Sequence, residues 1–243
     1  MKDSMHRPKN AAVVLGYLLT VLQVWGHFSG GKMSEKRWLI AVLAVLTVLS
    51  TTAAAQFEKN EVGGLFGKTV VSDQGIIGAT YFDPFVRFGK AWSTEAVYAR
   101  RIRMRAIYGI SLEVPAMFNF DEKLNAGIGI VPISYHAIFV TPAARVNLFP
   151  TTAVSPWVSF GGGFGHFSQD PNLIYGGGAN PGKSTTTGVI QGGIGLDVKV
   201  LNRWSIRGEA RDFYSGHPDF PLADTGKTRQ HNYFVGVGVL WHF

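Results

Sequence analysis

The chain has 243 residues, of which 46% are hydrophobic and 16% are charged, with 30 glycines, no cysteine and a formal net charge of +7. This composition excludes a disordered chain and fits one barrel or sandwich domain preceded by a leader. The lack of cysteine excludes a disulfide framework, so stability must come from backbone hydrogen bonds and packing.

The positive charge is concentrated in the first 55 residues. Residues 56–243 hold 17 Lys or Arg and 14 Asp or Glu, which gives this part a formal net charge of +3. Nucleic-acid binding requires a concentrated basic stripe, so this mild balance argues against a nucleic-acid partner.

Residues 33–55 are predicted to be a secretory signal peptide. Lys36 and Arg37 precede the apolar run Trp38–Leu49, and Ala53–Ala55 forms an A-x-A cleavage site. An apolar run of about a dozen residues is too short for a membrane-spanning helix. We therefore expect the mature protein to begin near Gln56.

The signal peptide begins at Met33 and not at Met1, and a second apolar segment, Ala11–Trp25, lies upstream of it. We interpret residues 1–32 as an over-extended gene start. The alternative is an additional anchor helix. N-terminal sequencing of the mature protein distinguishes the two, and a start far from Gln56 would contradict the interpretation.

After residue 56, segments of about ten residues alternate between apolar and polar side chains, and turn-rich stretches separate them. This pattern is typical of a membrane barrel, in which one face of each strand meets lipid. Eight strands are predicted, at Glu61–Val71, Ser93–Arg103, Arg105–Phe118, Ile138–Phe149, Trp157–Phe167, Val189–Val200, Trp204–Ser215 and His231–Phe243. Further strands within Ile76–Gly89 and Asn125–Ser134 would make ten. The predicted fold is all-β, an antiparallel up-and-down transmembrane β-barrel.

The last predicted strand has a uniformly apolar face from Tyr233 to Phe243, with aromatic residues at both ends. A strand of a soluble sandwich also alternates, so this strand alone does not decide the environment. A terminal aromatic resembles the signature that bacterial barrel-assembly machinery recognises. Phe243, Trp241 and Val239 are therefore the predicted assembly signal, with the assembly machinery and outer-membrane lipid as expected partners.

The predicted connections alternate between short and long. Short ones lie near Met104 and at 150–156 and 201–203, and long ones lie at 121–135, 168–187 and 216–230. Short turns are typical of the periplasmic side and long loops of the extracellular side. Pro142 falls inside a strand, so it must occupy a bulge or an unpaired position.

If the apolar faces meet lipid, the opposite faces collect charged residues of both signs in the lumen. Buried charges persist when they are paired, and eight strands leave just enough room for side chains. A side-chain-filled lumen is therefore favoured over a conducting pore, although ten strands would weaken this argument. The predicted charge network consists of Arg105, Glu113, Arg145, Asp197, Lys199, Arg207, Glu209 and Arg211.

Residues 177–184 match the phosphate-binding pattern G-x-x-x-x-G-K-[ST]. That chemistry requires a helix immediately after the lysine and serine, whereas Thr185–Gly188 leads into a predicted strand. We therefore expect no nucleotide partner, and the glycines read as ordinary loop residues.

His166 and Ser168 lie on the lipid-facing side of a predicted strand, near its outer end. They resemble the His-x-Ser pair of outer-membrane lipid A deacylases, in which a histidine activates a serine. The asparagine that follows in that family is replaced by Gln169, and no convincing acidic partner follows. A structural histidine at the rim is therefore favoured, and comparing lipid A with and without the protein tests the enzyme.

The remaining histidines and tryptophans are interpreted without a ligand. His136, His217 and His231 show no metal-ligand spacing, so neither a metal nor a cofactor is expected. Aromatic residues often mark membrane interfaces. The residues interpreted in this way are Trp157, Trp204, Trp241 and Tyr233.

Three stretches carry a resemblance to a known family. They are Phe139–Asn147 (FVTPAARVN), Ser155–Gly163 (SPWVSFGGG) and Gly208–Gly216 (GEARDFYSG). They resemble small outer-membrane β-barrel proteins of the OmpA-transmembrane-like class, particularly those of acidobacterial type, and the resemblance covers most of residues 56–243. It implies the barrel fold and the cell outer membrane, but no catalytic residues, and no C-terminal peptidoglycan-binding domain is expected.

Three functions are therefore considered. The first is a structural or loop-binding surface barrel without enzymatic activity, whose extracellular ligand the sequence does not name. The second is a small passive pore. The third is an outer-leaflet lipid-modifying enzyme, which depends on His166 and Ser168 alone.

Overall fold

The computed structural model describes residues 58–77, 85–126, 131–174, 184–219 and 228–243. The predicted leader, residues 1–55, lies outside this range. In the described residues, no helix has the length and apolar character needed to cross a membrane.

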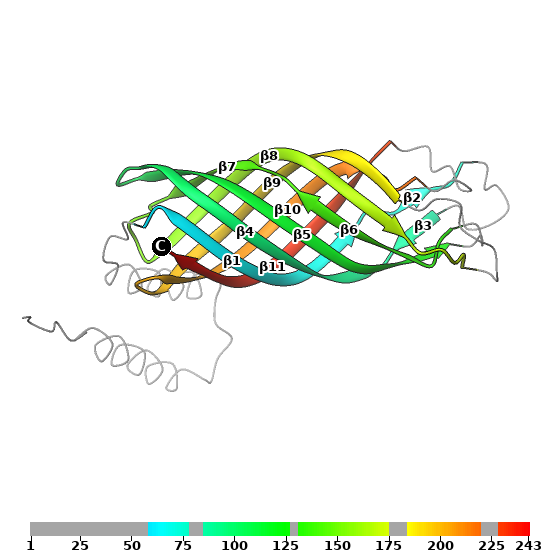
Figure 1. Ribbon diagram of the computed structural model, residues 1–243, viewed down its shortest axis with the longest axis horizontal. Helices are drawn as coiled ribbons and strands as arrows, with labels where there is room; N and C mark the ends of the chain where they lie inside the picture. The colour runs from blue at the N-terminus through cyan, green and yellow to red at the C-terminus, as the bar shows by residue number, and fades with distance from the viewer. Residues whose placement is uncertain (1–57, 78–84, 127–130, 175–183, 220–227) are drawn as a thin grey trace, which may run out of the picture. The chain divides into compact units, whose positions relative to one another are not determined.

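The regular structure of the described residues consists of β-strands (Figure 1). Most of them match the alternating segments of the sequence, because alternation places one apolar face outward along each strand. The strands are β1 (Asn60–Val71), β2 (Gln74–Gly75), β3 (Phe85–Phe88), β4 (Lys90–Met104), β5 (Tyr108–Ala126), β6 (Ser134–Val140), β7 (Ala143–Leu148), β8 (Val154–Gln169), β9 (Ser184–Leu201), β10 (Trp204–Gly216) and β11 (Arg229–His242).

Eight strand positions form a closed antiparallel ring. The ring runs β1, β4, β5, β6 with β7, β8, β9, β10 and β11, and β11 then pairs with β1. Strands β6 and β7 share one position, since both lie between β5 and β8. The short strands β2 and β3 extend the sheet at the far end of β5 and do not enter the ring. The prediction of eight strands in the barrel is confirmed. Strand β3 does lie within Ile76–Gly89, where the alternative placed a further strand, but it adds no position to the ring.

Pro142 lies in the break between β6 and β7. It has no N–H to donate to a ladder, and its carbonyl oxygen accepts a hydrogen bond of 3.1 Å from the Gly162 amide. Thr141, beside it, donates its amide to the Pro115 carbonyl at 3.2 Å. Pro142 is therefore in an unpaired position of its strand, as expected.

The two ends of the barrel differ. One end, here called the turn end, carries the short connections 105–107, 149–153 and 202–203. The C-terminus also lies there, where Phe243 and Asn60 exchange two backbone hydrogen bonds of 2.9 Å. The opposite end, here called the loop end, carries β2, β3 and the long connections (Figure 1). In a membrane barrel these are the periplasmic and extracellular ends, respectively.

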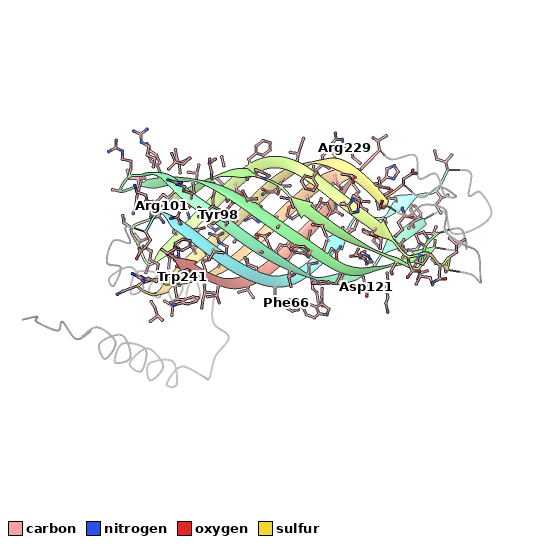
Figure 2. The ribbon with its side chains drawn as sticks, viewed as in Figure 1. Phe66, Tyr98, Arg101, Asp121, Arg229 and Trp241 are labelled. Carbon is pink, nitrogen blue, oxygen red and sulfur yellow. The ribbon has the colours of Figure 1, made fainter. Side chains whose placement is uncertain are left out.

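The outward faces of the strands form an apolar belt around the barrel. Val158, Ile194, Val235 and Val237 are each more than 50% exposed, although they lie in the middle of strands. Aromatic residues are also exposed near both ends, among them Trp92 and Phe120 toward the loop end and Trp241 at the turn end (Figure 2). A continuous apolar belt between aromatic girdles requires a lipid environment, and a closed ring excludes a sandwich. The chain is therefore an outer-membrane-type β-barrel.

Candidate functional site

The lumen is the candidate site, because it gathers most of the buried charged side chains. Two layers of side chains fill it. A charged layer lies toward the turn end and consists of Glu61, Glu95, Glu113, Arg145, Trp157, Asp197, Arg207, Glu209 and Arg211. An aromatic layer lies toward the loop end and consists of Met117, Tyr135, Phe139, Phe167, Phe213 and Phe234.

Arg207 on β10 is the first of three arginines in the charged layer. Its Nε and Nη2 donate to the two carboxylate oxygens of Asp197 on β9, at 2.7 and 2.8 Å. Its Nη2 also lies 3.2 Å from Oε1 of Glu61 on β1. The Arg207 side chain is fully buried, so this two-point pair is shielded from water.

Arg145 on β7 lies between two carboxylates from different strands. Its Nη2 lies 2.5 Å from Oε1 of Glu61, and its Nη1 lies 3.2 Å from Oε2 of Glu113 on β5. Its Nε donates to Oδ1 of Asn147 at 2.9 Å. Glu61 therefore joins Arg145 and Arg207 through a single oxygen, and the network crosses the barrel.

Arg211 on β10 holds three carboxyl groups. It pairs with Glu209 at 2.6 Å, with Glu113 at 2.8 Å and with Glu95 on β4 at 3.3 Å. Glu209 and Glu95 approach the same nitrogen, Nε, from different strands. Glu113 bonds both Arg211 and Arg145, so it connects this group to the rest of the charged layer.

Trp157 on β8 lies at the centre of the charged layer. The guanidinium carbons of Arg207, Arg211 and Arg145 lie 4.9, 5.1 and 5.8 Å from its ring centroid, within cation–π range. Its indole N–H donates to Asp197 at 3.1 Å. Trp157 is only 1% exposed, so its interpretation as a membrane-interface residue is wrong.

The structure places most of the predicted charge network in this layer, with two differences. Arg105 is exposed in the turn between β4 and β5, where its amide donates to the Tyr108 carbonyl at 2.8 Å. Its assignment to the lumen is wrong, because β5 begins only at Tyr108. The alternation of the strand therefore does not reach Arg105. Lys199 lies at the turn end, partly buried, with Nζ donating to the Pro150 carbonyl at 3.2 Å.

Sequence reasoning missed Glu61 and Glu95. Both lie in strands whose alternation is irregular in sequence, so their faces were not assigned. With them included, five carboxyl groups face three guanidinium groups in the charged layer, and acids exceed bases there. The two glutamates could have been found by extending alternation from the apolar residues Leu65 and Val97, which share their inward faces.

The aromatic layer was also not predicted, because the lumen was expected to be polar. Phe139 packs edge-on against Phe167 with centroids 5.5 Å apart, and against Phe213 at 5.2 Å. Tyr135 continues the layer at 5.8 Å from Phe167. All four side chains are fully buried. These rings form a hydrophobic cluster in the loop half of the lumen, beside buried polar side chains such as Asn119 and Glu122, which are hydrogen-bonded to each other.

His166 and Ser168 lie on the outer face of β8 near the loop end, as the sequence predicts. The His166 Nδ1 lies 2.8 Å from the hydroxyl of Thr186 on β9. In a His-activated serine the base is itself oriented by a third group, which is usually a carboxylate. Here a neutral hydroxyl occupies the place where that group would lie.

The other sequence motifs are placed as follows. Most of the P-loop-like stretch, residues 177–183, lies outside the described residues, and Ser184 begins a strand and not a helix. His231 bonds Asp212 at 2.7 Å, and His136 lies 3.9 Å from Asp121. In the part of the chain that the structure describes, no cluster of three metal-ligating side chains occurs.

The predicted assembly signal lies on the outer face of β11 and at its end. Val239, Trp241 and Phe243 are all at least 37% exposed. The rings of Trp241 and Phe243 stack with centroids 4.7 Å apart. This aromatic pair is therefore accessible from the lipid side of the barrel.

No protein-family model matches the chain, and no curated protein matches it either. Among solved structures, it is similar to Neisserial surface protein A (13% identity, 76% of this chain and 97% of that chain, TM-score 0.45). It is also similar to the outer membrane protein OprG from Pseudomonas aeruginosa (12% identity, 78% of this chain and 100% of that chain, TM-score 0.46). A third similar structure is the outer membrane enzyme PagL (13% identity, 75% of this chain and 99% of that chain, TM-score 0.40). Because these TM-scores are below 0.5, the conclusions on fold and location rest on the chain's own ring and apolar belt.

Proposed function

We propose that this protein is a closed outer-membrane scaffold that presents its extracellular loops for binding and does not conduct solutes. One observation carries the proposal, namely that two successive layers of side chains fill the lumen. A solute would have to displace three buried arginines with their carboxylates, and then a packed set of aromatic rings. Removing one partner of a buried ion pair is costly, so the charged layer resists opening.

Planar-bilayer recording tests the closed lumen. We expect the wild-type protein to give no steady single-channel currents, with its insertion verified by protease protection of the loops. Steady, ion-selective currents from the wild-type protein would contradict the proposal and would favour the small passive pore.

A variant with smaller side chains in the lumen shows whether the assay can detect an open barrel. Trp157→Ala, Phe139→Ala and Phe213→Ala together remove large side chains from both layers, and we expect intermittent currents from this variant. The matched control removes three outward side chains, Val158→Ala, Phe160→Ala and Phe164→Ala, and should remain silent. Heat-modifiable migration on gels shows whether each variant is folded.

Support for loop-mediated binding comes from the asymmetry of the two ends. The connections at the turn end are a few residues long, whereas those at the loop end are much longer. Exposed loops on a rigid scaffold commonly carry recognition. Screening the protein in nanodiscs against arrays of glycans and matrix proteins tests this, with a variant shortened within 175–183 and 220–227 as control. Binding that the shortened variant retains would contradict a loop-mediated role.

We also propose that the barrel acts without catalysis. The support is that His166 contacts a threonine hydroxyl, which cannot stabilise an imidazolium as a carboxylate does. Mass spectrometry of lipid A from cells with the wild-type protein and with the Ser168→Ala variant tests this. Identical acylation is expected, and a loss of acyl chains that depends on Ser168 would favour the lipid A deacylase-like alternative.

The finer family assignment, an OmpA-transmembrane-like barrel of acidobacterial type, belongs to this proposal as well. It is supported by the three sequence stretches already given, all of which contribute to the charged layer. Arg145 comes from the first stretch, Trp157 from the second, and Glu209 and Arg211 from the last.

A further inference from the structure

Basic residues are concentrated at the turn end of the barrel. Seven of the 17 Lys and Arg residues of 56–243 lie there. These seven, here called the basic rim, are Lys59, Arg100, Arg101, Arg103, Arg105, Lys199 and Arg203. Among the described side chains outside the lumen, Glu58 is the carboxylate at this end, and it lies 3.8 Å from Arg203. The mild overall charge of the barrel thus hides a local excess of cations.

The basic rim has a defined shape. A bulge between Arg101 and Arg103 shifts the pairing of β4 with β5, and Arg100, Arg103 and Arg105 are all exposed. Arg101 donates its Nη1 to the Glu58 carbonyl at 3.2 Å, and its amide to the Lys59 carbonyl at 2.7 Å. These bonds hold the start of β1 beside the β4–β5 hairpin.

A cleft of about 550 Å³ lies between these two segments. Its lining holds four basic side chains (Lys59, Arg101, Arg103 and Arg105), one carboxylate (Glu58), and Ile102, Met104, Ala106 and Thr151. The four cations outnumber the single carboxylate, so the lining is positively charged overall. Guanidinium groups bind phosphate oxygens through paired hydrogen bonds, and lysine adds a point charge. The lining therefore suits a phosphate group.

The cleft lies at the level of the membrane interface. The exposed aromatic residues Tyr98 and Trp241 mark the girdle at this end, and Figure 2 shows both at the same end of the barrel as Arg101. Arg100 follows Tyr98 by two residues and shares its outward face. Basic and aromatic side chains at such positions anchor in the headgroup region.

Apolar side chains are exposed beside the arginines of the same hairpin. Ile102 is 63% exposed and Ile107 is 65% exposed. A soluble acidic polymer would leave these side chains in water, whereas a lipid offers acyl chains beside its charged headgroup. The loop end differs, because its exposed cations Lys90 and Lys123 are interspersed with acids such as Asp121.

We propose that the cleft of the basic rim binds the phosphate headgroup of an anionic glycerophospholipid of the periplasmic leaflet. Lys59, Arg101, Arg103 and Arg105 contact the phosphate, while Ile102 and Ile107 lie against the acyl chains. The site is independent of whether the lumen is closed, so this inference does not depend on the proposed function.

Native mass spectrometry tests the site on the full mature barrel. The protein is released from nanodiscs that contain equal amounts of phosphatidylglycerol and phosphatidylcholine, and the retained lipid is identified. We expect wild-type protein to retain phosphatidylglycerol preferentially. The variant Lys59→Gln/Arg103→Gln/Arg105→Gln should weaken this preference by about tenfold or more, because each cation near a headgroup contributes substantially.

Two control variants are matched to the test variant. Lys68→Gln/Lys90→Gln/Lys123→Gln removes the same charge from the loop end and should keep the wild-type preference. Arg103→Lys/Arg105→Lys keeps the charge at the turn end and should retain most of the preference for phosphatidylglycerol. Should the glutamine variant fail to fold, a salt titration of the wild-type protein replaces it, and the preference should fall as the Debye length shortens from about 10 to about 3 Å.

Other results would overturn the proposal. An unchanged preference in the glutamine variant, or an equal loss in the loop-end control, would mean that the basic rim holds no specific lipid. A preference unchanged by salt would mean the same. Displacement of the lipid by millimolar inorganic phosphate would assign the cleft to free phosphate. Retention of soluble peptidoglycan fragments in place of lipid would assign it to the cell wall.

Discussion

Arg207 on β10 and Asp197 on β9 lie directly opposite each other in the sheet, and their side chains form two hydrogen bonds of 2.7 and 2.8 Å inside the lumen. Side chains along a strand alternate between the two faces, so a slip of one residue in either strand would turn one partner toward lipid. A charged side chain on the lipid face is strongly unfavourable at mid-membrane depth. This pair therefore specifies the register of β9 against β10 as well as contributing to stability.

Breaking this pair should destabilise the barrel. We expect Arg207→Ala to lower the free energy of unfolding by about 3–5 kcal/mol, because Asp197 and Glu61 would remain buried without it. Urea unfolding in detergent micelles, followed by tryptophan fluorescence, measures the change. Arg203→Ala is the control, since Arg203 is exposed and its contact with Glu58 should contribute less than about 1 kcal/mol. An equal effect of the two substitutions would contradict the role assigned to Arg207.

The glycines of β9 are predicted to differ sharply in their tolerance of a methyl group. At Gly195 an added Cβ would overlap the Trp157 indole and would lie 2.7 Å from the Gly208 carbonyl oxygen, whereas at Gly192 it would meet nothing within 4 Å. We expect Gly195→Ala to cost about 1–3 kcal/mol through overpacking, and Gly192→Ala to be close to neutral. Thermal shifts of heat-modifiable gel migration compare the two variants. Equal midpoints would indicate that Trp157 can move aside freely.

The aromatic layer should behave as a packed core. Phe213→Ala should lower the free energy of unfolding by about 3–5 kcal/mol, because the cavity forms among rigid neighbours. Phe160 on β8 is 69% exposed on the outer face, and lipid can fill the space that Phe160→Ala leaves. We therefore expect a smaller loss for Phe160→Ala in the same urea titration. A larger loss at Phe160 would show that the rings of the lumen are loosely packed.

Changes at Phe243 distinguish an effect on assembly in the cell from an effect on the stability of the folded barrel. Phe243→Ala keeps the two backbone hydrogen bonds with Asn60 and removes the ring, whereas deletion of Phe243 removes both. If the ring is the assembly signal, both variants should lower the yield of folded barrel in the outer membrane by a similar factor. Purified, refolded Phe243→Ala should be nearly as stable as wild type. Phe149 is another exposed aromatic residue at the turn end, so Phe149→Ala is the control for the loss of any one aromatic ring from this girdle.

A normal cellular yield of Phe243→Ala would contradict the assembly signal. A low yield together with low stability after refolding would assign the ring a structural role in place of a recognition role.

Much of the fold could be predicted from the sequence, because lipid imposes the same alternation on every strand. The outward positions of β11, from Tyr233 to Trp241, follow that pattern without exception. Inward positions are less predictable, since the inside of a narrow barrel accepts either paired charges or packed rings. Trp157 illustrates this, because an isolated tryptophan at the start of a strand looks the same in sequence whether it faces lipid or arginines.

The basic rim was missed for a different reason. Charge was averaged over residues 56–243, and the buried carboxylates of the lumen cancelled the exposed cations of the β4–β5 hairpin in the sum. Only the fold separates the two groups, since it places Glu95 inside the barrel and Arg100 outside on the same strand. Net charge is thus a poor guide to the surface of a protein with an ionised interior.

The pairing of β1 with β11 joins the two ends of the barrel sequence, with Glu61 opposite His242 and Val71 opposite Asn232. Contacts between residues so far apart in the chain are slow to form, because the loop that they close is long. Until the final strand docks, the nascent sheet has two free edges, which can pair with other chains. An exported chain of this design must therefore be kept from aggregating during its whole passage across the periplasm, and the barrel cannot close before β11 arrives.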